Sequence, residues 1–173
     1  MKALELPQTT NKQEVFETVA SYLRDLNIGI ADTDFDRPWG GFFVIEKEST
    51  AAFLGTFFPG YSYDDIADGL DLTPKILVAE PNKRLSWQYH YRREEIWSVV
   101  NGPVGVITSE TDEQSPVRSV RSGEVVAFGA ETRHRLIGLD NFGVVAEFWK
   151  HTDPANPSDE ADIVRVEDDF SRK

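Results

Sequence analysis

The chain has 173 residues, 40% of them hydrophobic and 12% aromatic, which favours a single domain with one buried core. Its formal net charge of -12 argues against binding to nucleic acid or to an anionic membrane surface, because the mean field repels polyanions. Cysteine is absent, which excludes disulfides and thiolate chemistry, and no apolar stretch is long enough to span a bilayer, so we expect a soluble, cytoplasmic protein.

The first predicted element is an amphipathic helix over residues 10–27. Thr10 or Asn11 is placed to cap its N-terminus, and Gln13 and Glu14 can complete a capping box. The apolar stripe of the helix consists of Val15, Val19, Tyr22 and Leu26. We expect this helix to pack over the outside of a domain or at a subunit contact.

Between residues 36 and 75 the pattern is mixed. Residues 36–41 predict a turn and residues 42–46 a strand. Residues 64–70 predict a short helix. An aromatic-rich segment that needs burial precedes them, with Phe53, Phe57 and Phe58.

From residue 75 onwards the sequence changes to short β-rich runs separated by glycine, proline and charged turns. Strands at this spacing are typical of a sandwich or barrel with antiparallel pairing. The expected strands cover residues 76–79, 85–90, 96–100, 104–108, 117–120, 125–128, 133–137 and 144–149. We therefore expect a mainly β, all-β class protein with a helical extension at residues 1–35 and a single barrel domain at residues 36–173.

Four polar residues of this β region form a candidate metal site. A period of two places Gln88 and His90 on one face of their strand. Glu95 begins the next strand, where an antiparallel hairpin would carry its carboxylate back towards His90, and a later strand supplies His134. Imidazole, carboxylate and amide oxygen suit a borderline or hard divalent ion, which would act as a Lewis acid on a carbonyl or a bound water.

Two stretches resemble the conserved motifs of the cupin family. Residues 88–90, followed by Glu95 and Gly102, look like the first motif with glutamine in place of its first histidine. Residues 123–134 resemble the second motif, which ends at His134. This resemblance implies a cupin barrel, that is, a double-stranded β-helix of jelly-roll type.

Within the cupins, the chain most closely resembles type II phosphomannose isomerases. The shared segments occur in that family's order and spacing, and they are residues 37–40, 84–90, 95–97, 134–136 and 162–168. The resemblance implies a divalent metal held by Gln88, His90, Glu95 and His134. Zn²⁺ is the first expectation, and Mn²⁺, Fe²⁺, Co²⁺ and Ni²⁺ also suit these ligands.

The resemblance also implies an enzyme of the mannose-6-phosphate isomerase type, which interconverts an aldose phosphate and its ketose. A proton moves between adjacent carbons through an enediol, so the site needs a base, stabilisation of oxyanion charge and a phosphate anchor. Arg165 is implied to stabilise the enediolate or to hold the phosphate, and Arg84 is a second candidate anchor. Glu95 or a metal-bound water is the candidate base, and the sequence leaves that choice open.

Departures from the family pattern keep other functions open. They lie near the mouth of the predicted barrel, at Tyr91, Arg92, Glu94 and Ile96. They are compatible with a different sugar, with a non-catalytic sugar-binding cupin, or with another metal-dependent cupin enzyme. Among the nearby cations, we expect Lys83, Arg92 and Arg93 to be solvated. The expected partner is a small-molecule sugar phosphate, and the tendency of cupins to pair favours a homodimer.

Overall fold

The computed structural model describes residues 3–8 and 11–172. The strands of this part of the chain are β1 (Ile30–Arg37), β2 (Gly40–Ile45), β3 (Lys75–Ala79), β4 (Trp87–Tyr89), β5 (Arg93–Asn101), β6 (Val104–Ser109), β7 (Arg118–Val120), β8 (Val125–Phe128), β9 (Arg133–Gly138), β10 (Gly143–His151) and β11 (Val164–Glu167). The helical elements are α1 (Lys12–Asp25), the 3-10 turn η1 (Lys47–Ser49), α2 (Thr50–Phe57) and α3 (Tyr63–Ile66).

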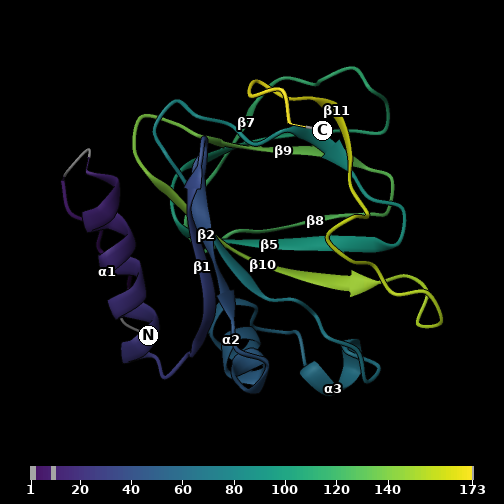
Figure 1. The fold of residues 1–173 in the computed structure, drawn as a ribbon, viewed down its shortest axis with the longest axis horizontal. Helices are drawn as coiled ribbons and strands as arrows, with labels where there is room; N and C mark the ends of the chain where they lie inside the picture. The colour runs from purple at the N-terminus through teal and green to yellow at the C-terminus, as the bar shows by residue number, and fades with distance from the viewer. Residues whose placement is uncertain (1–2, 9–10, 173) are drawn as a thin grey trace.

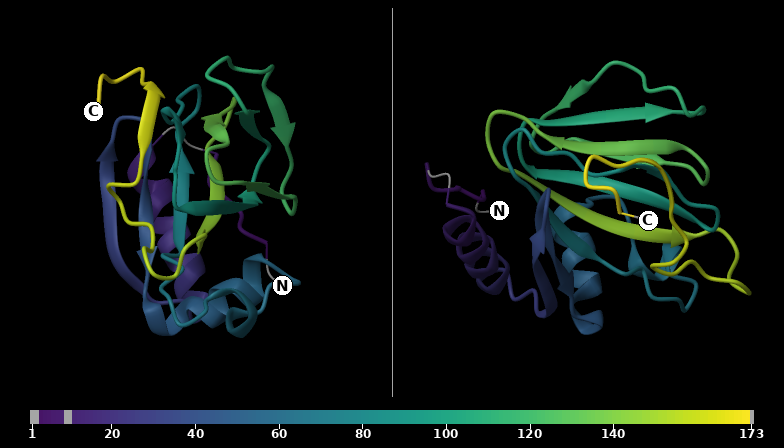
Figure 2. Two further views of the ribbon diagram at one scale, coloured as in Figure 1. Left: turned by 90° about the vertical axis from the view of Figure 1, so that its right-hand side faces the viewer. Right: turned by 45° about the horizontal axis from the view of Figure 1, so that its top comes forward.

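Two antiparallel sheets face each other to form a barrel, with the helices on one side (Figure 1, Figure 2). Over the described residues, one sheet has six strands in the order β1-β2-β3-β10-β5-β8, and the other has five in the order β11-β4-β9-β6-β7. All eight strands predicted after residue 75 are present, with ends that shift by a few residues. Within the described residues, no helix is long and apolar enough to cross a membrane.

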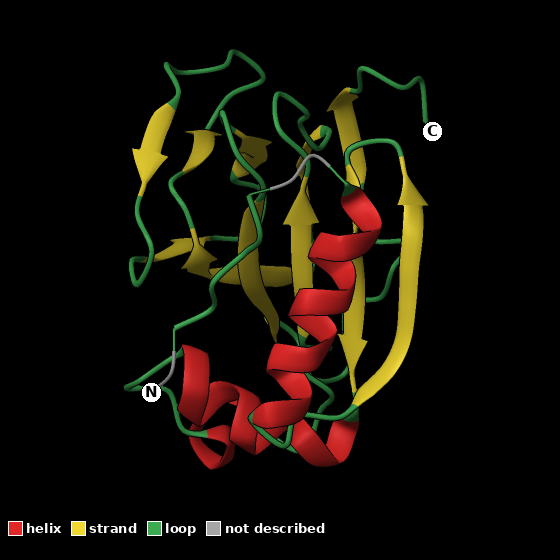
Figure 3. Cartoon of the chain, turned by 90° about the vertical axis from the view of Figure 1, so that its left-hand side faces the viewer, coloured by secondary structure: helices red, strands yellow, loops and turns green. Residues whose placement is uncertain are grey.

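Helix α1 packs on the outside of the six-stranded sheet, as Figure 3 shows. The Asn11 side chain caps it by accepting hydrogen bonds from the backbone N–H groups of Gln13 and Glu14 at 3.0 and 3.4 Å. Thr10, the other predicted cap, lies outside the described residues. The predicted stripe is confirmed, because Val15, Val19 and Tyr22 are buried and Leu26 is partly buried.

Strand β1 and helix α2 were not predicted. Strand β1 belongs to the same sheet as β2 and crosses the position where the domain was expected to begin, between residues 35 and 36. Helix α2 has no polar face, so it lacks the periodicity that marks a surface helix. The turn between β1 and β2 requires glycine at Gly40, which has a φ of +143° and where an added Cβ would lie 1.9 Å from the carbonyl oxygen of Val78.

The six-stranded sheet separates two apolar cores, and its β10 strand shows how. Ala146 and Phe148 face the helices, where they join a core that includes Val15 and Phe53. Val145 points the other way, into the barrel. Because side chains alternate along a strand, Glu147 and Trp149 continue the row that faces the barrel interior. The interior therefore changes from apolar to polar along β10, and the polar end holds the candidate site.

Candidate active site

Two histidines and a glutamate meet at the polar end of the barrel. His90 follows β4, Glu95 lies on β5 and His134 lies on β9. The Nε2 atom of His90 is 2.9 Å from one Glu95 carboxylate oxygen, and the Nε2 atom of His134 is 3.0 Å from the other. All three side chains are buried, and their ligand atoms lie within 4.8 Å of one another. The predicted proximity of these three residues is therefore confirmed.

Backbone carbonyls orient both imidazole rings. The Nδ1 atom of His90 lies 2.6 Å from the carbonyl oxygen of Asp162, and that of His134 lies 2.9 Å from the carbonyl oxygen of Thr132. A carbonyl oxygen only accepts, so each Nδ1 atom carries the hydrogen. Each Nε2 atom is thereby directed at Glu95, with its lone pair available whenever the ring is neutral. This is the usual arrangement behind metal-ligating histidines.

The cluster fits a divalent metal ion. Glu95 Oε2 and His134 Nε2 are buried atoms that lack a well-formed hydrogen bond. Unsatisfied buried polar atoms are costly, and a metal ion bound by both would remove the cost. Two imidazoles and one carboxylate match the donors that a catalytic zinc site uses.

A guanidinium group lies beside this cluster. Arg93 is buried and donates to Glu95 Oε1 at 2.9 Å, and one of its nitrogens lies 3.3 Å from His90 Nε2. Burial by itself raises the pKa of Glu95, but the electrostatic interactions with His90, Arg93 and His134 outweigh burial and hold that pKa well below its usual range. The prediction that Arg93 is solvated is therefore wrong, because the side chain turns into the barrel from the first residue of β5.

A cavity of about 440 Å³ opens beside the cluster, and it contains two of the other predicted site residues. Gln88 lines the cavity and lies directly opposite His134 in the β4–β9 pair, where its Oε1 atom accepts a hydrogen bond from the Ser86 hydroxyl at 2.6 Å. Arg165 lines the cavity from β11 and lies opposite Gln88 in the β4–β11 pair. The fourth-ligand role of Gln88 and the substrate role of Arg165 stay predictions.

Arg84 is placed differently from the other predicted residues. Its guanidinium group forms two hydrogen bonds with the Asp169 carboxylate, at 2.6 and 2.8 Å, and one with Glu167 at 3.2 Å. Arg84 does not line the cavity that contains Arg165. The structure thus brings Gln88, His90, Glu95, His134 and Arg165 to one end of the barrel, and it places Arg84 against the C-terminal segment.

Arg37 and Arg172 also line the cavity and surround Arg165. Burial lowers the pKa of Arg165, as does the charge of Arg172 and, to a smaller extent, that of Arg37, whereas Asp168 opposes the shift. With Arg93, four guanidinium groups line this cavity and form a cationic region, in which Arg37 pairs with Asp34 at 2.8 Å and Arg172 pairs with Asp168 at 2.6 Å. Such a region suits an anionic ligand group such as a phosphate.

Two further charged residues of the cavity were not singled out from the sequence. Lys75 on β3 and Glu147 on β10 are both buried and directly opposite each other in the β3–β10 pair. The ammonium group of Lys75 pairs with Glu160 and lies 4.5 Å from the centre of the Trp149 ring. The sequence signal was present: Glu147 interrupts an otherwise apolar strand at an inward-facing position.

The carboxylate of Glu147 has an unusual protonation equilibrium. Burial is the largest cause and the negative charge of Glu95 adds to it, so the pKa of Glu147 rises from 4.5 to about 7 although Lys75 and Arg93 oppose the shift. The charged groups that face it are therefore Lys75 on β3 and Arg93 and Glu95 on β5.

This shift predicts a pH dependence of stability in the metal-free protein. Between pH 4.5 and about 7, folded Glu147 keeps a proton that the unfolded chain has released, so the free energy of unfolding falls as the pH rises. Across this window, the free energy of unfolding of the wild-type protein should fall by about 3 kcal/mol more than that of Glu147→Gln, at ~1.4 kcal/mol per pKa unit. Urea unfolding at pH 5 and pH 8 in the presence of a chelator measures the difference.

The control for this measurement is Glu94→Gln. Glu94 lies next to Glu95 on β5, but its side chain is exposed and pairs with Lys150 at 3.4 Å. Its substitution should leave the pH dependence of the wild-type protein unchanged. Parallel stability curves for the wild-type protein and Glu147→Gln would contradict the raised pKa of Glu147.

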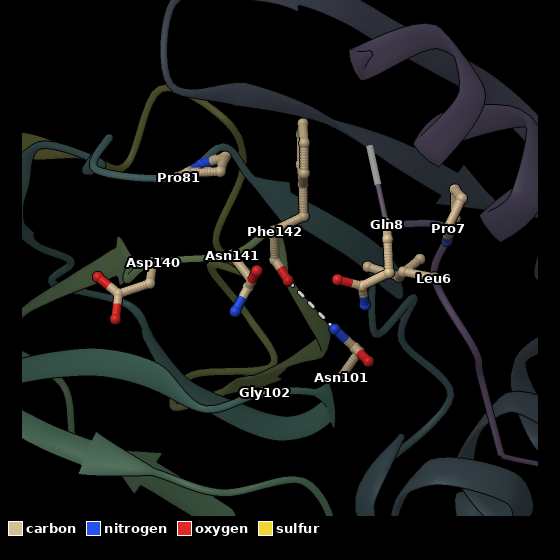
Figure 4. Close-up of a pocket in the computed structure, with 9 residues that line it drawn as sticks. All are labelled: Leu6, Pro7, Gln8, Pro81, Asn101, Gly102, Asp140, Asn141 and Phe142. Atoms are coloured by element: carbon tan, nitrogen blue, oxygen red, sulfur yellow. Dashed lines mark hydrogen bonds between the residues drawn. The ribbon is translucent and has the colours of Figure 1, made fainter. Parts of the chain in front are cut away.

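A second cavity, of about 220 Å³, shares no residue with the first (Figure 4). The turn after β5 and the turn before β10 line it together with residues 6–8, and within it the Asn101 amide donates to the carbonyl oxygen of Phe142 at 3.1 Å. Asp140 is the ionisable side chain among its lining residues. The cavity therefore lacks the combination of cations and metal ligands that marks the first.

Comparison with known proteins identifies one family. Residues 46–168, more than two thirds of the chain, match the family model described as "Mannose-6-phosphate isomerase C-terminal". No curated protein sequence matches the chain.

Solved structures share the fold at low sequence identity. The capsular polysaccharide assembling protein CapF from Staphylococcus aureus has a TM-score of 0.53 and 17% identity over 79% of this chain and 34% of CapF. Vicilin from Corylus avellana (hazelnut) has a TM-score of 0.53 and 15% identity over 80% of this chain and 36% of vicilin. A sugar phosphate isomerase of the cupin superfamily from Silicibacter pomeroyi has a TM-score of 0.41 and 18% identity over 49% of this chain and 54% of its own.

At these identities the likenesses show the fold alone, and this chain spans about a third of the length of CapF and of vicilin. The predicted fold, a mainly β cupin barrel with an N-terminal helix, is confirmed.

Proposed function

The chain belongs to the family of mannose-6-phosphate isomerase C-terminal domains, and from this premise we propose that it is a metal-dependent sugar-phosphate isomerase. The proposed substrate is mannose 6-phosphate or a close analogue. The proposed reaction interconverts the aldose and the ketose by proton transfer through an enediol.

One observation carries the proposal: the metal-ligand cluster and several guanidinium groups lie at the same cavity. Glu95 of the cluster lines the cavity together with Arg37, Arg165 and Arg172. A sugar phosphate has a carbonyl group at one end and a phosphate at the other, so it needs these two kinds of group in one cavity. The guanidinium groups supply fixed positive charge to a phosphate in a chain whose net charge is -12.

Each of these residues would have a separate role in the reaction. His90, Glu95 and His134 would hold the divalent metal, with Gln88 as the proposed fourth ligand. The metal, when bound, supplies Lewis-acid polarisation of the sugar carbonyl. Arg165 would hold the phosphate or stabilise the enediolate, because a guanidinium group is a fixed cation that matches phosphate geometry.

The test is proton exchange at carbon 2 of mannose 6-phosphate in deuterated water. The metal-loaded wild-type protein should incorporate deuterium and form the ketose. Arg165→Ala should lower kcat/KM by about 100-fold, since a preorganised donor at developing charge is typically worth 10²–10³. Arg118→Ala, at an exposed position on β7, is the matched control and should match the wild type. Absence of exchange with every divalent metal offered would refute the isomerase assignment.

A non-catalytic sugar-binding cupin is the second candidate, and the position of Arg93 favours it. The buried guanidinium group lies 2.9 Å from Glu95 and 3.3 Å from His90, so it partly neutralises the cluster in the absence of metal. Such a protein would bind mannose 6-phosphate without any exchange at carbon 2, and the same measurement separates the two candidates. Another metal-dependent cupin enzyme, the homodimer and the cytoplasmic location stay predictions.

A further inference from the structure

Glu147 has a buried carboxyl group, and neither the proposed metal site nor the proposed phosphate site includes it. It lies on β10, its exposed fraction is 6%, and it lines the cavity. Burying a carboxyl group in a barrel wall is costly unless it is paired or has a function. Its presence in a strand whose other inward residues are apolar or aromatic therefore calls for a physical explanation.

Two indole rings hold the Glu147 carboxylate in one orientation. Trp97 donates its Nε1–H to Glu147 Oε2 at 2.9 Å, and Trp149 donates its Nε1–H to Glu147 Oε1 at 3.1 Å. Both rings are buried, so the carboxylate is fixed by rigid donors. An acceptor oxygen has a second lone pair, so each oxygen can still take up a proton while it keeps its indole bond.

Glu147 is also positioned next to the metal-ligand cluster. In the β5–β10 pair, Glu147 lies opposite Trp97, and Trp149 lies opposite Glu95. Glu147 and Glu95 are thus diagonal neighbours on the same inner face, where backbone positions are about 7 Å apart, and both line the same cavity. A substrate whose carbonyl oxygen lies at the cluster would therefore have its carbons 1 and 2 on the side of Glu147.

We propose that Glu147 is the catalytic acid–base of the reaction, which takes the proton from carbon 2 of the aldose phosphate and delivers it to carbon 1. This inference rests on the proposed isomerase function and identifies the catalytic base, which the sequence left undecided. Glu95 suits this role less, because both of its oxygens face histidine or arginine nitrogens.

The transfer balances without any other reactant. The Glu147 carboxylate removes the proton from carbon 2, and the electron pair of the C2–H bond forms the double bond between carbons 1 and 2. The π electrons of the carbonyl move onto oxygen 1, which takes a proton as oxygen 2 releases one. Protonated Glu147 then gives its proton to carbon 1, and the carbon–oxygen double bond forms at carbon 2. Nothing is oxidised or reduced overall, and the carboxylate is regenerated.

The protonation equilibrium of Glu147 supports this role. An acid–base group is most effective when its pKa lies near the working pH, and burial raises the pKa of Glu147 to about 7.

The experiment compares Glu147→Gln and Glu147→Asp with the wild-type protein, each loaded with the same metal. Glu147→Gln keeps an oxygen acceptor for an indole and cannot take the proton, so exchange at carbon 2 of mannose 6-phosphate should fall at least about 100-fold, in the range that a general base contributes. Glu147→Asp should recover part of this loss, because it restores a carboxylate. Glu94→Gln should match the wild type.

Three measurements separate a catalytic role from a structural one. Metal content and the dissociation constant of the nonreacting analogue mannitol 1-phosphate should stay within about threefold of the wild type in Glu147→Gln, because neither depends on proton transfer. The acidic limb of the wild-type pH–rate profile should be absent from the residual activity of Glu147→Gln.

Each outcome gives a decision. If the exchange rate at carbon 2 in Glu147→Gln is within threefold of the wild-type rate, the role of Glu147 is overturned and the isomerase assignment stands. Loss of metal or of analogue binding in Glu147→Gln, in parallel with the loss of exchange and without recovery in Glu147→Asp, would also overturn it in favour of a structural role. Absence of exchange in the wild-type protein would refute the isomerase function itself, and this inference with it.

Discussion

The double variant His90→Ala/His134→Ala is expected to bind no stoichiometric divalent metal. It leaves Glu95 as the remaining member of a cluster whose three ligand atoms lie within 4.8 Å of one another. A carboxylate, even with the neutral Gln88 amide beside it, does not hold a borderline divalent ion, because affinity at such sites depends on the number and geometry of the ligands. Metal content after dialysis against a trace of Zn²⁺ or Mn²⁺ measures the loss.

Thermal unfolding gives a second readout of the same site. A ligand that binds the folded state alone at 100 times its dissociation constant stabilises it by about 2.7 kcal/mol, so added metal should raise the melting temperature of the wild type and not of the double variant. The control is His151→Ala, because His151 bonds to the carbonyl oxygen of Asp71 and lies outside the cluster. One equivalent of metal retained by the double variant would place the metal site elsewhere.

Asp162→Ala is expected to lower the free energy of unfolding by about 4 kcal/mol, because it leaves several buried donors without an acceptor. The Asp162 carboxylate accepts from the backbone N–H groups of Tyr91 and Arg92 at 3.0 and 2.9 Å, and from the Ser158 hydroxyl at 2.7 Å. Together these bonds join the loop before β11 to the β4–β5 turn. Denaturant unfolding measures the change.

The effect of Asp162→Ala should depend on pH. Burial raises the pKa of Asp162, but the hydrogen bonds from Ser158, Tyr91 and Arg92 outweigh burial and lower that pKa below 3.8. The stabilisation is therefore complete above about pH 4 and is lost as the pH falls through the lowered value. Asp153→Ala, on the exposed part of the same loop, should change stability by less than about 1 kcal/mol. A similar loss in both variants would contradict the role given to Asp162.

Asp162 also supports the metal-ligand cluster. Its carbonyl oxygen accepts the Nδ1–H of His90, so displacement of this backbone should misorient the ring. Loss of a group that orients a metal ligand typically costs 10–100-fold in affinity, so we expect Asp162→Ala to weaken metal binding by about tenfold. Arg93 also donates to this region, through Ser158 at 3.0 Å, which connects the loop to Glu95.

The sequence by itself determined the strands after residue 75 and the three residues of the candidate metal site. Short β-rich runs bounded by glycine, proline and charged turns are a local property, so each predicted strand after residue 75 is present in the barrel. His90, Glu95 and His134 were identified because their motifs have a fixed spacing on neighbouring strands. Asn11 was identified because a helix cap is satisfied within its own first turn.

The tertiary structure alone decided which charged side chains enter the barrel. Arg92 and Arg93 are adjacent in the sequence, yet the first bonds to the 156–162 loop and the second is buried against Glu95. Lys75 and Glu147 are 72 residues apart and meet because β3 and β10 are neighbours in one sheet. Strand pairing between distant segments sets burial, and burial sets pKa, so the raised pKa of Glu147 follows from topology and is invisible in the local sequence.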